Sequence, residues 1–141
     1  MVFEIPLRVR YMEVDAQGVV FNGWYLTYFD EALAEFLRAT GTGYAELITM
    51  GLDTQLVHAE VDWKAGLRWR DDFTVAVSAA KVGQTSFTLD FETRRGGEVT
   101  CTAQIVYVVV ATDGSGKRPV PPALAAVLGE SAPMAPADQS G

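Results

Sequence analysis

The sequence is poor in the residues that most often build nucleophilic and metal sites. Its 141 residues include one cysteine, Cys101, and one histidine, His58. A lone cysteine cannot form an internal disulfide, which fits a reducing compartment, so the cytoplasm is the expected location. A zinc cluster is not expected, and a Ser-His-Asp or Cys-His device would depend on His58 alone. The sequence also contains no GxxxxGK loop, no GxGxxG after a strand and no GxSxG elbow.

Long hydrophobic runs and positive charge are lacking too. The longest apolar run, Ile105 to Ala111, is far shorter than the roughly 20 residues that cross a bilayer, so no membrane span is expected. The N-terminus alternates polar and apolar residues and lacks the apolar core of a signal peptide. The net charge of −7 argues against nucleic acid as a partner. Local cations could still hold a small anionic ligand, or could merely solvate strand ends. The candidates are Arg68, Arg70, Arg94 and Arg95.

The clearest periodic segment is a helix from about Trp24 to Thr40. Asn22 is suited to cap its start, and Gly41 to stop it. Its apolar residues recur at steps of three and four, which places them on one face. They are Leu26, Phe29, Leu33, Phe36 and Leu37.

After this helix the apolar period changes from 3.6 to two, which indicates a sheet. One strand is expected before the helix and four after it, with short helical pieces at 43–50 and 119–128. The expected strands are 3–11, Leu56–Trp63, Phe73–Lys81, Thr85–Arg94 and Val99–Thr112. The order predicts an α+β fold with one domain over 1–128 and a loose tail over 129–141. One helix covers only one face of such a sheet, so its other face and its edges favour dimerisation.

The loop before the long helix, EVDAQGVVFNGWY at 13–25, is the best candidate for chemistry. Asp15 lies there among apolar residues, where weaker solvation makes a carboxylate a stronger base or nucleophile. The start of the helix near Asn22 offers unpaired N–H groups that can bind an oxyanion. Carboxylate and oxyanion donors together suffice for acyl transfer to water. The alternative is that Asp15 only turns or caps its loop.

The segment RVRYMEVDAQGVVFNGWYLTYFDEALAEFL resembles the 4-hydroxybenzoyl-CoA thioesterase-like family of hotdog proteins, which includes the acyl-CoA thioesterases linked to the Tol-Pal system. VDWKAGLRWRDDF at 61–73 is similar to the family's strand-turn-strand segment. The resemblance covers about residues 5–112. The residues that fit the motif are Arg10, Asp15, Gly18, Val19, Val20, Phe21, Tyr25, Phe29, Ala32 and Phe36.

This resemblance implies a hotdog fold, in which a five-stranded, mainly antiparallel sheet wraps a long central helix. It implies hydrolysis of an acyl-CoA or acyl-carrier-protein thioester, with Asp15 as nucleophile or general base and the N–H of Asn22 as oxyanion donor. Many members have His where Asn22 stands, so Asp15 here lacks a titratable partner. Coenzyme A would enter as part of the substrate, with no metal or other cofactor. The family's sites lie at dimer interfaces, so a homodimer or homotetramer is expected.

Further residues are candidates for contacting the substrate. Trp24 stands where family members usually carry smaller residues, and it would shorten an acyl tunnel; Trp63 and Trp69 could line the same pocket. Thr85 and Ser86 would present hydroxyls to a partner's site, although ordinary strand-start hydroxyls explain them as well. The predicted substrate-binding residues are Gly18, Val19, Phe21, Trp24, Tyr25, Thr85 and Ser86.

Two other functions remain open at this point. A non-catalytic acyl-CoA-binding module is compatible with Asn22 in place of His, although pure binding needs no carboxylate such as Asp15 beside an anionic ligand. A hotdog hydratase ranks last, because that motif pairs Asp with His. His58 is expected to be a surface or core histidine, and Cys101 a small core residue.

Overall fold

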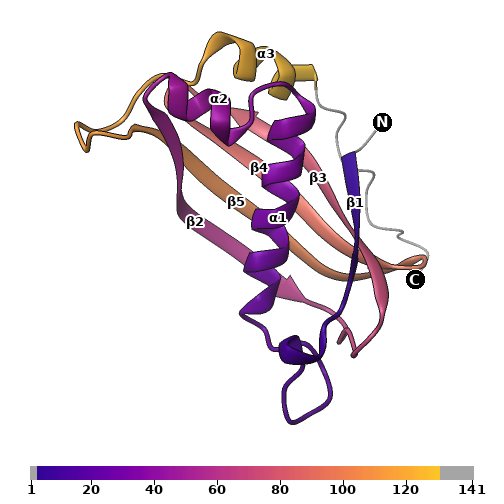
Figure 1. Cartoon of the computed structure of the whole chain (residues 1–141). Helices are drawn as coiled ribbons and strands as arrows, with labels where there is room; N and C mark the ends of the chain where they lie inside the picture. Colours follow the sequence, from indigo (N-terminus) through magenta and orange to yellow (C-terminus); the bar gives the residue numbers. More distant parts are fainter. Residues whose placement is uncertain (1–2, 131–141) are drawn as a thin grey trace.

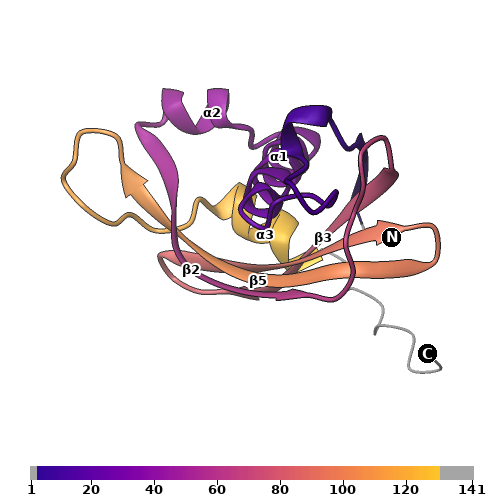
Figure 2. The ribbon, with the colours of Figure 1, turned by 90° about the horizontal axis from the view of Figure 1, so that it is seen from below.

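An antiparallel sheet curves around one long helix in the computed structural model, which describes residues 3–130 (Figure 1). The spatial order of its strands is β1-β3-β4-β5-β2. The strands are β1 (Phe3–Arg8), β2 (Leu52–Trp63), β3 (Asp72–Val82), β4 (Ser86–Arg95) and β5 (Glu98–Ala111). The helices are α1 (Trp24–Ala39), α2 (Tyr44–Thr49) and α3 (Pro122–Glu130). Seen from below, α1 lies on the concave face of the sheet, and no helix among residues 3–130 covers the opposite face of the sheet (Figure 2). The predicted α+β class is confirmed.

Helix α1 forms where the period predicted it, and its buried face packs on β1 and β3. Phe29 is fully buried, with its ring centroid 5.0 Å from that of Phe91 in β4. The prediction for Leu26 was wrong, since this residue is 39% exposed. The buried stripe that contains Phe29 and Leu33 passes through Tyr25 in the first turn, which turns Leu26 toward the outside.

The first strand is shorter than predicted. It ends at Arg8, and Tyr11–Glu13 form a turn of 3-10 helix in which Tyr11 is 75% exposed. The cause is Glu13, whose carboxylate accepts hydrogen bonds from the Arg10 N–H at 2.8 Å and from the Arg10 guanidinium at 2.9 Å. These bonds fold the chain back before the strand can continue.

The other boundaries shift by a few residues. β4 starts at Ser86, which leaves Thr85 in the preceding turn, and β2 starts four residues before the predicted Leu56. β5 is an internal strand between β4 and β2, in agreement with its apolar character on both faces. α3 continues to Glu130, past the predicted domain end, and the rest of the predicted tail lies outside the described residues.

Strand β2 forms one edge of the sheet, and its outer side has no neighbour within residues 3–130. It exposes Leu56 (40%), Val57 (53%) and Trp63 (51%). His58 on this strand is also exposed, with its Nε2 atom 3.3 Å from Glu60 Oε1, so the prediction of a surface histidine is confirmed. By contrast, Cys101 is fully buried, and burial raises the pKa of its thiol to about 12, as expected of a core residue.

Candidate active site

The loop that carries Asp15 is a tight hairpin closed by hydrogen bonds between its own backbone groups. Val14 and Val20 form an antiparallel bridge, and the Asp15 N–H donates to the Val19 carbonyl at 2.9 Å. Gly18 closes the turn by donating to the Asp15 carbonyl at 3.0 Å, with a φ of +79° that favours glycine. The hairpin therefore holds Asp15 in a fixed position at its base.

The Asp15 carboxylate is half-buried and has one oxygen engaged. Oδ1 accepts a hydrogen bond from the Gln17 N–H at 2.8 Å, which is the local turn that the simpler interpretation of Asp15 predicted. No group within residues 3–130 donates to Oδ2. The turn orients the carboxylate and leaves an oxygen available to a ligand or water.

The carboxylate of Glu13, at the start of this hairpin, is buried although its ion-pair partner Arg10 is exposed. Glu13 is 2% exposed and accepts hydrogen bonds from Arg10 and, at 2.9 Å, from the Tyr28 hydroxyl. The pKa of Tyr28 is raised mainly by burial, and the hydrogen bond to the Glu13 carboxylate is the next largest cause. The Glu13 carbonyl also accepts from the Phe21 N–H at 2.9 Å, which ties the exit of the hairpin to its entry. Sequence reasoning missed this role because Glu13 stood out only as an acidic position of the motif.

Helix α1 starts beside the hairpin, and its cap differs from the prediction. Gly23 occupies the N-cap position, and no side chain caps the helix, so the expected cap by the Asn22 side chain is wrong. Asn22 closes the first turn through its carbonyl, which accepts from the Tyr25 N–H at 3.3 Å. Within residues 3–130 the backbone N–H groups of Asn22 and Gly23 donate to no protein acceptor. Two free donors thus lie at the positive end of the helix dipole.

Asp15 and Asn22 open on the same cavity, of about 590 Å³. It lies between the hairpin and the start of α1 on one side and the end of β2 with the β2–β3 connection on the other. The lining residues are Asp15, Gln17, Val19, Val20, Phe21, Asn22, Tyr25, Trp63, Lys64, Ala65 and Gly66.

Five of the predicted site residues line this cavity, and four do not. Asp15, Val19, Phe21, Asn22 and Tyr25 are brought together there. Gly18, Trp24, Thr85 and Ser86 are absent from the lining.

Trp24 is the clearest correction among these residues. It packs under the guanidinium of Arg10, whose Cζ is 5.9 Å from the ring centroid, so it does not shorten the cavity. Trp63 contributes an indole to the lining instead, with its ring 6.5 Å from Tyr25. Thr85 and Ser86 stand at the turn into β4, where the Thr85 carbonyl accepts from the Val109 N–H at 2.9 Å. Their expected role toward a partner subunit stays a prediction.

The connection between β2 and β3, residues 64–71, is in direct contact with the hairpin. The Val20 N–H donates to the Leu67 carbonyl at 2.8 Å, and a Cβ on Gly66 would lie 2.7 Å from Val19 Cγ1. Only glycine permits so close an approach. Sequence reasoning did not select Gly66 or Lys64, although both lie in the turn that resembles the family's strand-turn-strand segment.

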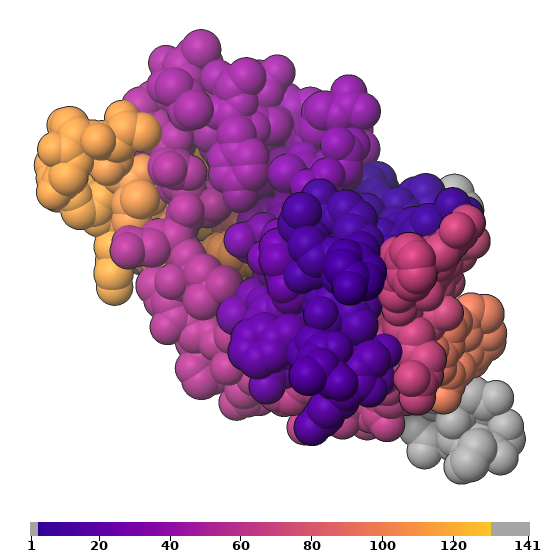
Figure 3. Space-filling model, turned by 60° about the horizontal axis from the view of Figure 1, so that its bottom comes forward, coloured from indigo at the N-terminus to yellow at the C-terminus, as the bar shows by residue number. Residues whose placement is uncertain are grey.

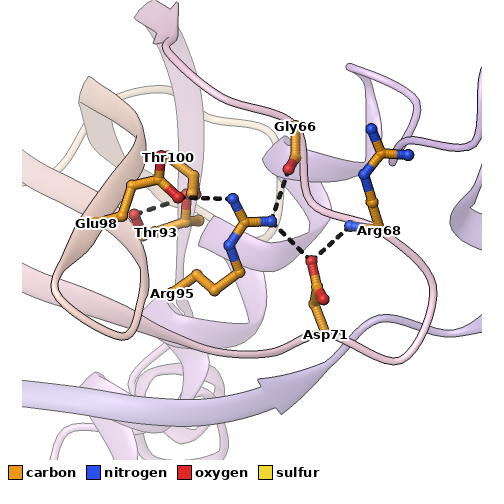
Figure 4. Close-up of polar contacts among 7 residues, drawn as sticks. All are labelled: Gly66, Arg68, Asp71, Thr93, Arg95, Glu98 and Thr100. Carbon is orange, nitrogen blue, oxygen red and sulfur yellow. Dashed lines mark hydrogen bonds and ion pairs between the residues drawn. The ribbon is translucent and has the colours of Figure 1, made fainter.

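Arg95 anchors this connection to the sheet (Figure 4). Its guanidinium donates to the Gly66 carbonyl at 2.9 Å, to Asp71 Oδ2 at 2.8 Å and to Glu98 Oε1 at 2.6 Å. Burial alone would raise the pKa of Asp71, but the Arg68 N–H, the Arg95 guanidinium and their charges lower it overall. Arg95 thereby fixes the β2–β3 connection, which lies 24 to 29 residues earlier in the sequence, at the wall of the cavity.

Residues 3–130 contain no cluster of three or more His, Cys, Asp or Glu side chains arranged to hold a metal ion. In the same range, no helix has both the length and the apolarity that crossing a membrane requires.

A helix wrapped by a five-stranded antiparallel sheet, with a carboxylate and free N–H groups at the start of the helix, defines a hotdog protein of the thioesterase type. The chain belongs to the thioesterase-like superfamily, whose family model matches residues 9–128.

Individual relatives agree with this assignment. An Aquifex aeolicus protein with the provisional name of an esterase is 36% identical over 91 residues, which cover 64% of this chain and 71% of that protein. The 1,4-dihydroxy-2-naphthoyl-CoA hydrolase of Synechococcus elongatus is 23% identical over 84% of this chain and 89% of its own length. The solved structure of the gentisyl-coenzyme A thioesterase BH1999 superposes with a TM-score of 0.83 at 25% identity, covering 89% of this chain and 99% of that one.

Proposed function

We propose that this protein hydrolyses acyl-CoA thioesters to a carboxylic acid and a free thiol. The observation that carries the proposal is that Asp15 and Asn22 line one cavity, and that the unpaired N–H of Asn22 is followed in the chain by that of Gly23. The names of the relatives support the substrate class, since they include hydrolases and thioesterases of aromatic CoA esters.

In this mechanism the thioester carbonyl points toward the start of α1. Asp15 takes a proton from water, and the oxygen of that water attacks the carbonyl carbon. The N–H groups of Asn22 and Gly23 stabilise the tetrahedral oxyanion, together with the helix dipole. When the oxyanion collapses, the C–S bond breaks and the thiolate leaves, taking up a proton. In the alternative route Asp15 itself attacks and forms a mixed anhydride, which water then hydrolyses.

The test is thiol release from a panel of acyl- and aryl-CoA esters by wild type and Asp15→Asn. The variant keeps a side-chain oxygen that can accept the Gln17 N–H, so its loop retains its turn. A loss of at least about a hundredfold in kcat supports the proposal. Binding of acyl-CoA by both proteins without turnover would identify a non-catalytic binding module. A non-catalytic binding module is the second candidate function, because the hydrogen bond from the Gln17 N–H gives Asp15 a structural role in its turn.

We further propose that the protein acts in the cytoplasm as a homodimer, or as a homotetramer formed by two such dimers. The unpaired edge of β2 with its exposed Leu56, Val57 and Trp63 supports pairing with a second copy, because such an edge invites strand addition. Trp63 lines the cavity as well, so a partner on this edge would help to enclose the substrate. Sedimentation equilibrium of wild type and Val57→Lys tests this: a monomeric wild type would refute it.

A further inference from the structure

The four arginines singled out in the sequence fall into two pairs with different surroundings. Arg94 forms ion pairs with Glu4 at 2.7 Å and Glu92 at 2.8 Å, and Arg95 forms ion pairs with Asp71 and Glu98. The charges of both arginines are therefore matched by carboxylates of this chain. Arg68 and Arg70 are exposed, and neither guanidinium forms an ion pair or hydrogen bond within residues 3–130.

The acidic residues around Arg68 and Arg70 are already matched by other cations. Asp71 is bound by Arg95, and Asp72 by Arg8 at 2.8 Å. The guanidiniums of Arg68 and Arg70 act on these carboxylates only from a distance, by helping to lower the pKa of Asp71 and of Asp72, respectively. Among residues 3–130 these two guanidiniums therefore have no ion-pair partner, on a chain whose net charge is −7.

The position of Arg68 relates this charge to the candidate active site. Its Nη1 atom lies 3.6 Å from where a Cβ on Gly18 would be, against the turn of the Asp15 hairpin. The close-up shows the guanidinium directed away from the Asp71 carboxylate, although the Arg68 backbone N–H donates to that carboxylate at 2.8 Å (Figure 4). The space-filling view shows the β2–β3 connection and the N-terminal hairpin side by side on one face (Figure 3).

Trp69, which lies between the two arginines in the sequence, forms an exposed aromatic pair with Tyr11. Trp69 is 54% exposed, and Tyr11 is 75% exposed; their ring centroids are 5.5 Å apart in an edge-to-face arrangement. The next residue, Arg70, has a φ of +70°, the only positive value for a non-glycine residue within the described residues. The backbone is thus held in a conformation that costs free energy, which is common where side chains are presented to a ligand.

We propose that Arg68, Trp69, Arg70 and Tyr11 form a nucleotide-binding surface beside the cavity, which takes the adenine nucleotide end of a coenzyme A thioester. The guanidiniums bind phosphate groups, and the aromatic pair offers a face for the adenine ring. The inference rests on the proposed function and deepens it, because it assigns the carrier of the acyl group. An acyl carrier protein attaches the same phosphopantetheine arm to a serine and brings no adenine to this surface.

The test separates nucleotide binding from catalysis. Adenosine 3′,5′-bisphosphate, which has the nucleotide but no thioester, is titrated into wild type, Arg68→Gln, Arg70→Gln and Trp69→Ala by calorimetry. Each arginine variant is expected to weaken binding about tenfold, and Trp69→Ala about fivefold. Lys81→Gln is the matched control, since Lys81 is an exposed cation of β3 outside this surface, and we expect it to bind as wild type does.

Kinetics with two substrates complete the test. The variants should raise KM for an acyl-CoA and leave kcat/KM unchanged for the same acyl group on N-acetylcysteamine, which lacks the nucleotide. No binding of the bisphosphate to wild type, or equal losses with both substrates, would overturn the nucleotide-binding surface. If neither substrate is hydrolysed but the bisphosphate binds with the predicted pattern, the proposed function fails while the surface stands.

Discussion

Replacing Gly66 with alanine tests the contact that joins the β2–β3 connection to the Asp15 hairpin. The added Cβ would lie 2.7 Å from Val19 Cγ1 and 3.2 Å from Val19 Cβ. Carbon atoms at their optimal separation are about 3.5–4.0 Å apart, so one of the two segments must move by about 1 Å. Both are tied down: Val20 bonds to the Leu67 carbonyl, and Arg95 holds the Gly66 carbonyl. A rotation of the Val19 side chain would move Cγ1 but would leave the added Cβ 3.2 Å from Val19 Cβ.

From this geometry we expect Gly66→Ala to lower the free energy of unfolding by about 1–3 kcal/mol, the usual cost of overpacking. For a chain of this length that corresponds to a melting temperature lower by about 3–10 °C. A displacement of about 1 Å at the hairpin should also reduce kcat by up to about a hundredfold, because Asp15 moves with Val19. Thermal denaturation by circular dichroism and thiol release measure the two effects.

The control is Gly97→Ala in the β4–β5 turn, where an added Cβ meets nothing within 4 Å and no large loss is expected. The double variant Gly66→Ala/Val19→Ala should recover part of the lost stability relative to the sum of the single variants, because it removes Val19 Cγ1, the atom nearest the added Cβ. Wild-type stability and kcat in Gly66→Ala would refute the argument. Additive losses in the double variant would show that the clash lies elsewhere.

Three further predictions concern stability and reactivity. Phe29→Ala should cost about 3–5 kcal/mol, because it empties a fully buried site against Phe91; urea denaturation would show it, and a loss below about 1 kcal/mol would contradict the packing. Asp71→Asn should cost about 1 kcal/mol or less at pH 7. Since the pKa of Asp71 is lowered in the folded state, that difference is present above the unfolded pKa of about 3.9 and should disappear as pH falls below it; a difference that grows in acid would contradict the sign. Cys101, with a thiol pKa near 12 and no exposure, should react with a thiol reagent at pH 8 only after unfolding in guanidinium; rapid labelling of the native protein would contradict its burial.

Local pattern alone predicted the elements well. The helix expected from Trp24 to about Thr40 ends at Ala39, and the four later strands appear with boundaries shifted by four residues or fewer. Apolar period and glycine position are local properties, so they are visible without a fold. The early end of β1 was missed because a single polar contact decides it: Glu13 binds Arg10, and no sequence period signals such a contact.

The candidate site was predictable in part. The motif around Asp15 selected the hairpin and the start of α1, because those residues are neighbours in the chain and keep a fixed spacing. The opposite wall of the cavity, with Trp63, Lys64 and Gly66, comes from a turn about 50 residues later, and only the folded sheet brings it to the hairpin.

The sequence by itself determined the α+β class, the position of α1 and the choice of Asp15 as the candidate carboxylate, since period, caps and motif spacing are properties of neighbouring residues. Only the tertiary structure decided which arginines are free. Arg94 and Arg95 look like Arg68 and Arg70 in the sequence, but strand register places Glu4, Glu92, Asp71 and Glu98 beside the first pair and no carboxylate within ion-pair distance of the second among residues 3–130. Ion pairing depends on distances between segments far apart in the chain, and those distances exist only after folding.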